Sequence, residues 1–190
     1  MIRVLDLGCG VKPIFMEEAE VVYLDRVKFP YVDVVWDLNK FPYPFKSNTF
    51  DVVFARHVIE HLNYPIKTIN EIWRILKPKG ILKIWVPYYK SHTAFTDPTH
   101  KHYFTPFSFD YWDPTNLHFY YLHYQLNSQP TQPNPKARFK IIKKELHFFS
   151  FLKLLTPFTR LNTFLWFYEL VLSNLLPPPY EIYVEMEAIK

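Results

Sequence analysis

Five short apolar runs, each followed by a polar or turn-forming stretch, constrain the fold of this chain more than any other feature. Their β-branched and aromatic residues are nearly continuous, which is typical of strands in a parallel sheet that is covered on both faces. We therefore predict an α/β core with five strands. The runs are Arg3–Leu7, Val21–Asp25, Val32–Asp37, Phe50–Arg56 and Ile81–Pro87.

Two helices are predicted between these runs. The clearer one extends from Pro65 to Leu76, because its apolar residues recur at helical spacing and proline is favoured in a first helical turn. The segment Lys77–Gly80 supplies its stop signal and a turn that would explain Gly80. A shorter helix is predicted over Lys12–Ala19, with Pro13 tolerated in its first turn.

The pattern changes after residue 87. Residues 88–138 form a long aromatic segment that is rich in histidine and proline and has no clean period. An alternating run, Arg138–Phe149, predicts a sixth strand, residues 158–176 have a helical apolar pattern, and Glu181–Ile189 predicts a final strand. The sum is one domain over residues 1–190, with a five-strand α/β core, two later strands and insertions at 88–138 and 150–180 that cover the core or contact substrate.

Charge and composition narrow the class of protein. A formal charge of +4 permits an anionic partner without requiring one. The lone cysteine, Cys9, excludes an internal disulfide, and no signal peptide is recognised at the start. The apolar segment 161–176 is interrupted by Glu169 and is too short to span a bilayer. We therefore expect a soluble, cytoplasmic protein.

Two of only three glycines stand one residue apart, directly after the first predicted strand. Glycine permits positive φ and lets a ligand approach the main chain, so Gly8 and Gly10 predict a ligand-binding turn, although an ordinary loop explains the pair equally well. A helix after this turn would present free N–H groups to the ligand. The dinucleotide fingerprint is absent, because its third glycine would fall on Pro13.

Two aspartates decide between these alternatives. Asp25 ends the second predicted strand and Asp37 ends the third, which places both at the carboxyl edge of the sheet, where open α/β sheets bind ligands. A carboxylate at Asp25 can accept two hydrogen bonds from a ribose diol, and Asp37 lies within reach of an exocyclic amine. The pattern therefore favours a nucleoside-containing ligand.

The ordered motifs DLGCGVKP, DLNKFPYPF, HVIEHL and RILKPKG resemble the class I S-adenosylmethionine-dependent methyltransferases over residues 3 to about 105. The resemblance implies an α/β fold with a Rossmann-like seven-strand sheet whose last strand is antiparallel. It also implies methyl transfer, with S-adenosylmethionine as cofactor and S-adenosylhomocysteine as product. It assigns the loop after strand one to the methionine part of the cofactor, Asp25 to the ribose and Asp37 to the adenine. Lys12-Pro13 replaces the third glycine that the family often has, so we expect the loop to surround the methionine end of the cofactor in an unusual way. The cofactor-binding residues implied are Asp6, Leu7, Gly8, Cys9, Gly10, Asp25, Arg26, Asp37, Leu38, Ala55, Arg56 and His57.

The methyl acceptor is expected to contact the segment after strand five, where titratable side chains are dense. His92 and His100 are the candidate general bases. The alternative is a loop pinned by its own hydrogen bonds, with a turn at Thr96-Asp97-Pro98. The further substrate residues predicted are Tyr88, Tyr89, Asp97, His102 and Tyr103.

Two patterns raise the question of a metal. His57 to His61 read H-x-x-E-H, but the first histidine ends a predicted strand, whereas the inverted zinc-protease pattern needs a helix. A second set combines Asp97 with three histidines, and its spacing matches no common zinc site. We therefore predict no metal ligand. The histidines of the second set are His92, His100 and His102.

The acceptor itself is not readable from the sequence. Aromatic and apolar content favours a small or lipid-like molecule over nucleic acid, because no Lys or Arg accompanies the aromatic strip 118–126. The basic run 136–144 alternates like a strand with one solvated face. The apolar stretch 158–176 covers the core, lines a pocket or contacts a membrane. The alternative functions are a non-catalytic cofactor-binding partner subunit, an RNA methyltransferase and a nicotinamide-binding oxidoreductase.

Overall fold

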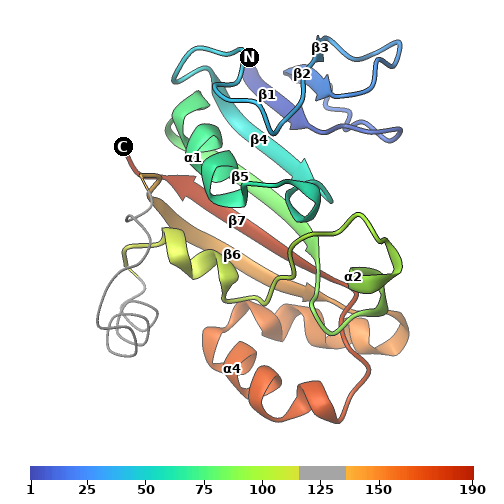
Figure 1. The fold of residues 1–190 in the computed structure, drawn as a ribbon. Helices are drawn as coiled ribbons and strands as arrows, with labels where there is room; N and C mark the ends of the chain where they lie inside the picture. The colour runs from blue at the N-terminus through green and yellow to red at the C-terminus, as the bar shows by residue number, and fades with distance from the viewer. Residues whose placement is uncertain (116–135) are drawn as a thin grey trace.

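The computed structural model describes residues 1–115 and 136–190. Within them seven strands form one sheet in the order β3-β2-β1-β4-β5-β7-β6, and Figure 1 shows these strands side by side. The predicted strip 118–126 lies outside the described residues. The strands are β1 (Ile2–Leu7), β2 (Ala19–Asp25), β3 (Val34–Val35), β4 (Phe50–Arg56), β5 (Leu76–Pro87), β6 (Phe139–His147) and β7 (Glu181–Ala188).

The sheet topology confirms the predicted Rossmann-like arrangement. Strands β1 to β5 pair in parallel, whereas β7 runs antiparallel to both β5 and β6. The chain extends from β1 towards β3 on one side and from β4 towards β6 on the other. The strand order therefore reverses between β1 and β4, which is where such sheets form a ligand crevice at their carboxyl edge.

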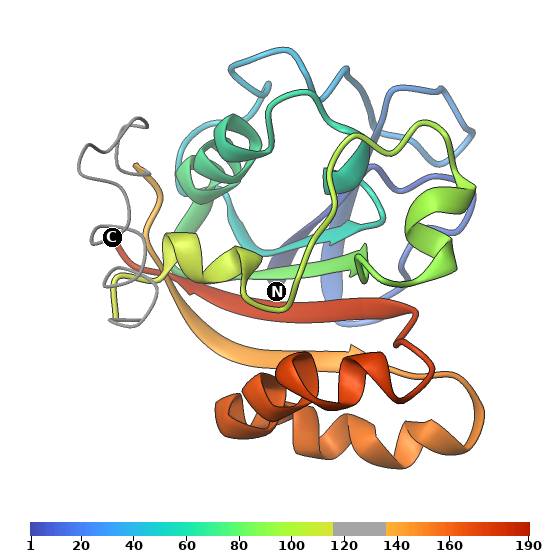
Figure 2. The same ribbon diagram turned by 60° about the horizontal axis from the view of Figure 1, so that its bottom comes forward.

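Helical segments lie on and around this sheet. Figure 2 shows η3 and α4 next to β6, away from α1, and Figure 1 shows α2 near the carboxyl end of β5. The α-helices are α1 (Pro65–Ile75), α2 (His92–Thr96) and α4 (Asn162–Leu170). The 3₁₀ helices are η1 (Ile59–His61), η2 (Ser108–Trp112), η3 (Ser150–Arg160) and η4 (Leu172–Asn174).

The predicted helix over Pro65–Leu76 is confirmed as α1. Proline occupies its first turn, and Ile69, Ile72 and Ile75 are completely buried on one face of the helix. These positions follow the helical period, so burial of a single apolar stripe stabilises α1 against the sheet.

The link from α1 into β5 differs from the prediction. We predicted a turn over Lys77–Gly80, but β5 begins at Leu76, and its pairing with β4 is irregular between the Leu76 and Ile81 pairs. The positive φ, 62°, belongs to Lys79 rather than to Gly80. Gly80 is required for space, because a Cβ there would lie 2.9 Å from the carbonyl oxygen of Lys77.

Strand β3 is much shorter than the predicted Val32–Asp37. Only Val34 and Val35 pair with β2. The side chain of Asp33 accepts a hydrogen bond from the main chain of Tyr23, 2.9 Å away, and its own nitrogen donates to the Tyr23 carbonyl. A side chain thus replaces a ladder bond before the strand begins, so the sheet edge is short.

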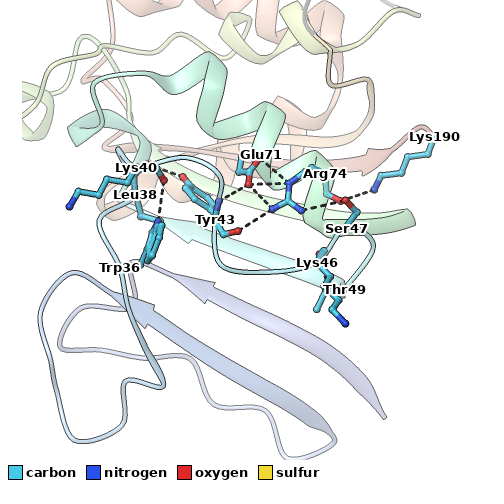
Figure 3. A network of polar contacts seen from close by, with 10 residues as sticks. All are labelled: Trp36, Leu38, Lys40, Tyr43, Lys46, Ser47, Thr49, Glu71, Arg74 and Lys190. Atoms are coloured by element: carbon cyan, nitrogen blue, oxygen red, sulfur yellow. Dashed lines mark hydrogen bonds and ion pairs between the residues drawn. The ribbon is translucent and has the colours of Figure 1, made fainter.

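The loop between β3 and β4 is held by α1, as Figure 3 shows. Glu71 accepts a hydrogen bond from the main-chain nitrogen of Tyr43 over 2.6 Å, and Arg74 donates to the Tyr43 carbonyl over 3.2 Å. Arg74 and Glu71 are themselves ion-paired at 2.6 Å. The Tyr43 hydroxyl donates to the Leu38 carbonyl, so this network fixes the start of the loop near the carboxyl edge.

Candidate cofactor and acceptor site

The loop after β1 is attached to the end of β2 by main-chain hydrogen bonds. The nitrogens of Gly8 and Cys9 donate to the Leu24 carbonyl over 2.8 and 3.1 Å. The Gly10 nitrogen donates to Asp25 Oδ2 over 2.8 Å. The predicted ligand-binding turn therefore forms, and it presents its main chain at the carboxyl edge of the sheet.

The two glycines serve different purposes, although both have positive φ, 70° at Gly8 and 56° at Gly10. A Cβ at Gly8 would lie 2.5 Å from Val58 Cγ2, so this glycine allows the loop to approach the segment before η1. A Cβ at Gly10 would meet no atom within 4 Å. The main chain at Gly10 therefore borders open space, where a ligand can approach.

Asp25 lies beside that open space. Its side chain is largely buried, and its Oδ1 accepts a hydrogen bond from the Val27 nitrogen over 2.9 Å. Each carboxylate oxygen thus uses one acceptor position for the main chain and keeps another for a ligand hydroxyl. The neighbouring Arg26, also predicted to contact the cofactor, is exposed.

Asp6 is the buried acid of the loop. Its Oδ2 accepts from the Ile14 nitrogen over 2.8 Å and pairs with Arg56 Nη2 at 3.2 Å. Its Oδ1 is buried and has no hydrogen-bond partner among the described residues. Burial raises the pKa of Asp6, although the bonds with Ile14 and Arg56 oppose that shift. An unpartnered buried acceptor is a position that a ligand donor can satisfy.

The predicted helix over Lys12–Ala19 is wrong. Residues 11–18 are turns and extended chain, and Arg56 Nη2 donates to the Lys12 carbonyl over 2.7 Å. A helix this short is marginal without tertiary support, and Asp6 satisfies the Ile14 nitrogen instead. No helix therefore follows the Gly10 turn directly, within residues 11–18, and side chains from β1 and β4 hold the loop in place.

The remaining predicted cofactor residues fall into buried and exposed groups. Leu7 and Ala55 are completely buried, and Leu38 is largely buried. Cys9 is buried as well, and burial raises the pKa of its thiol to about 11, which keeps it protonated and unreactive. Asp37 is exposed, two residues beyond β3, and its Oδ1 accepts from the Asn39 nitrogen over 3.0 Å.

His57 follows β4 in a left-handed conformation, with φ at 51°. Its Nε2 lies 3.0 Å from Glu181 Oε2, and the other oxygen of Glu181 lies 2.7 Å from His147 Nδ1. The hydrogen bond with Glu181, assisted by Glu60, raises the pKa of His57 to about 9. Burial alone would raise the pKa of Glu181, but its bonds with His147 and His57 lower it to about 2.

The segment after β5 contains two tyrosines that hold α4. The Tyr88 hydroxyl donates to Glu169 Oε1 over 2.8 Å, and the Tyr89 hydroxyl donates to Oε2 over 3.3 Å. Tyr88 is completely buried, so it supports the packing of α4 and presents no surface of its own.

The two candidate bases have different surroundings. His92 is exposed at the start of α2 and stacks on Phe149 with a 6.3 Å separation of ring centroids. His100 packs edge-on against His61 at 4.6 Å, and its Nδ1 lies 2.8 Å from the Ala94 carbonyl oxygen. The two histidines thus contact different neighbours.

The other predicted substrate residues lie along the same segment. Asp97 Oδ1 accepts from both the nitrogen and the hydroxyl of Thr99, over 2.8 and 2.7 Å, which is the self-pinned turn considered as the alternative. Tyr103 is half exposed and stacks on Phe95. His102 is partly buried, with an Nε2 that has no partner among the described residues.

Sequence reasoning missed four polar residues of this edge. Glu60 is completely buried in η1, and Glu169 receives the two tyrosines. Glu181 begins β7 and His147 ends β6, and the register places them opposite each other. No local signal distinguishes Glu181 from the other glutamates of β7, Glu185 and Glu187, and nothing in the sequence links it to His57, 124 residues away.

Comparisons with known proteins agree with this geometry. Residues 5–84 match the family described as a methyltransferase domain. Over these residues the chain is similar to class I S-adenosylmethionine-dependent methyltransferases. An uncharacterized protein of Methanocaldococcus jannaschii is 40% identical over 90 residues, which is 44% of this chain and 40% of that one. Phosphoethanolamine N-methyltransferase 2 of Caenorhabditis elegans is 32% identical over 76 residues, 40% of this chain and 16% of that one. The chain thus matches less than half the length of these curated relatives.

Solved structures of methyltransferases share the fold. A S-adenosylmethionine-dependent methyltransferase from Archaeoglobus fulgidus aligns with a TM-score of 0.57 at 18% identity, over 98% of this chain and 86% of that one. One from Mesorhizobium loti aligns with a TM-score of 0.51 at 13% identity, over 98% and 90%. At these identities the likeness concerns the fold of the methyltransferase domain alone.

The methyltransferase family and fold imply S-adenosylmethionine as the cofactor, and the residues fit it. The unpartnered Asp6 Oδ1 and the spare acceptor positions of Asp25 suit a ligand with ammonium and hydroxyl donors. The open space at Gly10 leaves room for such a ligand.

No helix within the described residues of this methyltransferase domain is long and apolar enough to cross a membrane.

Proposed function

We propose that this chain transfers a methyl group from S-adenosylmethionine to a small-molecule acceptor. The observation that carries the proposal is the pairing of open main chain at Gly10 with the Asp25 carboxylate, which accepts a hydrogen bond from that same residue. The pairing lies at the carboxyl edge near the reversal of strand order, where ligands of this fold class bind.

Each residue of the loop has a task in this proposal. Asp25 accepts hydrogen bonds from the ribose hydroxyls, and Asp6 Oδ1 accepts from the methionine part of the cofactor. Arg56 holds Asp6 in place and neutralises part of its charge. When bound, S-adenosylmethionine supplies a methyl group that its positive sulfonium already activates. The remaining task of the protein is alignment and exclusion of water, which together can lower a barrier by roughly 7–11 kcal/mol.

The acceptor in this proposal lies beyond the ends of β4 and β5. The charged group His57, Glu181 and His147 faces that edge and suits a polar acceptor. A general base is required only for an acceptor that arrives protonated. His92 is our candidate, because it is exposed and lines a pocket of about 570 Å³ together with Thr93, Thr96, Asp97 and Pro98.

Two observations support a small molecule as acceptor. One curated relative is named for methylation of phosphoethanolamine, which is a small molecule. The described part of the acceptor edge is formed by aromatic side chains and paired charges, such as Tyr89 with Glu169 and His57 with Glu181. These acidic groups are already partnered within the protein and would repel phosphates, so the contacts named here do not favour single-stranded nucleic acid.

Cofactor binding can be tested by calorimetry with S-adenosylmethionine. Asp25→Asn is expected to weaken binding at least about tenfold, because a hydrogen bond to a charged group contributes about 1.5–3 kcal/mol. Glu20→Gln is the matched control, since Glu20 lies in the same strand and forms an exposed ion pair with Arg3. Equal affinities for Asp25→Asn and the unchanged protein would remove Asp25 from the site.

Methyl transfer is tested separately with cofactor that carries a labelled methyl group. We expect label to appear in a fraction of small metabolites and not in a matched RNA fraction. Label in RNA alone would overturn the small-molecule assignment. Tight cofactor binding without label in any fraction would instead support the non-catalytic partner subunit.

A further inference from the structure

We propose that Glu60, His61 and His100 bind a divalent transition-metal ion, for which Zn²⁺ is the best chemical match. One potential ligand atom from each residue lies within 4.8 Å of the others. Glu60 and His61 belong to η1, whereas His100 lies after α2, so the ion would join two segments that are 39 residues apart in the sequence. The proposal does not depend on methyl transfer.

The first argument is the carboxylate of Glu60. Its side chain is completely buried, and neither of its oxygens has a hydrogen-bond partner among the described residues. His57 Nδ1 lies 3.4 Å from Glu60 Oε1, which is an ion-pair distance rather than a hydrogen bond. Burial of a carboxylate without hydrogen bonds is unfavourable, so a buried acid of this kind calls for a further cationic partner.

The second argument is the protonation pattern of His100. Its Nδ1 lies 2.8 Å from the carbonyl oxygen of Ala94. A carbonyl oxygen only accepts hydrogen bonds, so Nδ1 carries the proton and the neutral ring keeps its lone pair on Nε2. Histidines that bind metals usually donate their other ring nitrogen to such an acceptor, which fixes the ring orientation.

His61 also carries its proton on Nδ1, because its acceptor is a hydroxyl that a further residue orients. Its Nδ1 lies 2.9 Å from Thr99 Oγ1, and that hydroxyl donates to Asp97 Oδ1 over 2.7 Å. The proton of the hydroxyl is thus committed to Asp97, so the oxygen accepts from His61 Nδ1. The lone pair of His61 again remains on Nε2. The turn at Asp97 therefore orients a ligand in this proposal.

The ligand chemistry selects the ion. Two imidazoles and one carboxylate suit zinc and neighbouring transition metals, whereas Mg²⁺ and Ca²⁺ prefer sites made of oxygen alone. Three protein ligands leave a position open for water or another molecule. This set differs from both metal patterns considered from the sequence, because it takes only His61 and Glu60 from the first and only His100 from the second.

The test uses the full chain after removal of metals with a chelator. Titration with ZnCl₂ in a calorimeter is expected to show a single bound ion per chain, and titration with MgCl₂ to show much weaker binding. His100→Gln and His61→Gln are each expected to weaken zinc binding at least about tenfold. His92→Gln is the matched control, because this histidine lies in the same segment but outside the three-residue group.

Folding of each variant is checked by circular dichroism, and cobalt(II) provides a readout on the unchanged chain. Bound cobalt is expected to give an intense visible absorption spectrum that zinc abolishes and that His100→Gln loses. Absence of stoichiometric zinc binding by the unchanged chain would overturn the proposal. So would equal loss of affinity in His92→Gln and His100→Gln, because the metal would then bind elsewhere.

Discussion

The main-chain nitrogen of Gly10 donates to Asp25 Oδ2 over 2.8 Å, which fastens the loop after β1 to the end of β2. The bond orients the carboxylate at the place where the main chain borders open space. It also explains why the loop keeps its shape without a following helix, since side chains from neighbouring strands satisfy its nitrogens. Gly8 is crowded by Val58 whereas Gly10 borders open space, so substitutions at the two glycines can test this arrangement.

Alanine at the two glycines should separate folding from binding. Positive φ alone costs a side chain about 1–2 kcal/mol, so Gly10→Ala should lower the free energy of unfolding by that amount and weaken cofactor binding. Gly8→Ala adds a steric overlap with Val58, which should lower the free energy of unfolding by about 1–3 kcal/mol more. Urea unfolding and calorimetry measure both effects. Equal stability of the two variants would contradict the crowding at Gly8.

Stability near His147 should depend on pH. The hydrogen bond with Glu181 raises the pKa of His147, against the effect of burial and with help from Glu145. Because the pKa of His147 is raised, the stabilisation by its charged ring is fully present below the pKa of histidine in the unfolded chain, about 6.5. It is lost as the pH rises through the higher pKa of His147 in the folded protein. His147→Gln should therefore lose about 1.5–3 kcal/mol of unfolding free energy at pH 6. Its deficit should shrink towards pH 9.

Urea unfolding of both proteins at several pH values checks this expectation. Glu181, Glu145 and the rings of Tyr180 and Tyr183 face His147 and are present in both proteins, so the difference isolates the imidazole. A deficit that stays constant or grows above pH 8 would show that the ring acts through packing alone.

The sequence allowed much of the sheet to be predicted, because apolar runs report directly on burial. Phe50–Arg56 was located without error, and Asp25 was correctly placed at the carboxyl edge. Both are local statements, since a continuous apolar run specifies a buried strand and a strand end specifies an edge. The Rossmann-like class of the sheet was predicted from the family resemblance, without its strand order.

The errors share a physical cause, which is that side chains replaced main-chain partners. Asp6 satisfies the Ile14 nitrogen where a helix was predicted, and Asp33 satisfies the Tyr23 nitrogen where a longer β3 was predicted. The contact of His57 with Glu181 depends on the antiparallel register of β7, which no local pattern encodes. Such contacts become visible only once the strands are arranged in space.

Loss of the Tyr88 hydroxyl should loosen α4. Tyr88→Phe keeps the buried ring but removes the donor to Glu169 Oε1, and a hydrogen bond to a charged group contributes about 1.5–3 kcal/mol. Tyr103→Phe is the matched control, because that ring is half exposed and its change should stay within about 0.5 kcal/mol. Thermal unfolding of the two variants decides, and equal melting temperatures would contradict the proposed support of α4.

The buried ion pair of Lys144 with Asp110 should hold η2 to β6. Both side chains are almost completely buried, so removal of Lys144 takes the ion-pair partner away from a buried carboxylate. Lys144→Met should therefore lower the free energy of unfolding by about 3–5 kcal/mol. Lys143→Met is the control on the same strand, since its ion pair with Glu145 is partly exposed and should contribute about 0–1 kcal/mol.

The double variant Lys144→Met with Asp110→Leu distinguishes charge from packing at this contact. If the loss in Lys144→Met arises because the buried carboxylate of Asp110 has lost its ion pair, removing Asp110 as well should recover stability, since an apolar pair of similar volume replaces a buried ion pair at little cost. Urea unfolding of the unchanged protein, Lys144→Met, Asp110→Leu and the double variant completes a double-mutant cycle. Additive losses would mean that the two residues stabilise the fold independently, and η2 would then be held to β6 by its aromatic side chains.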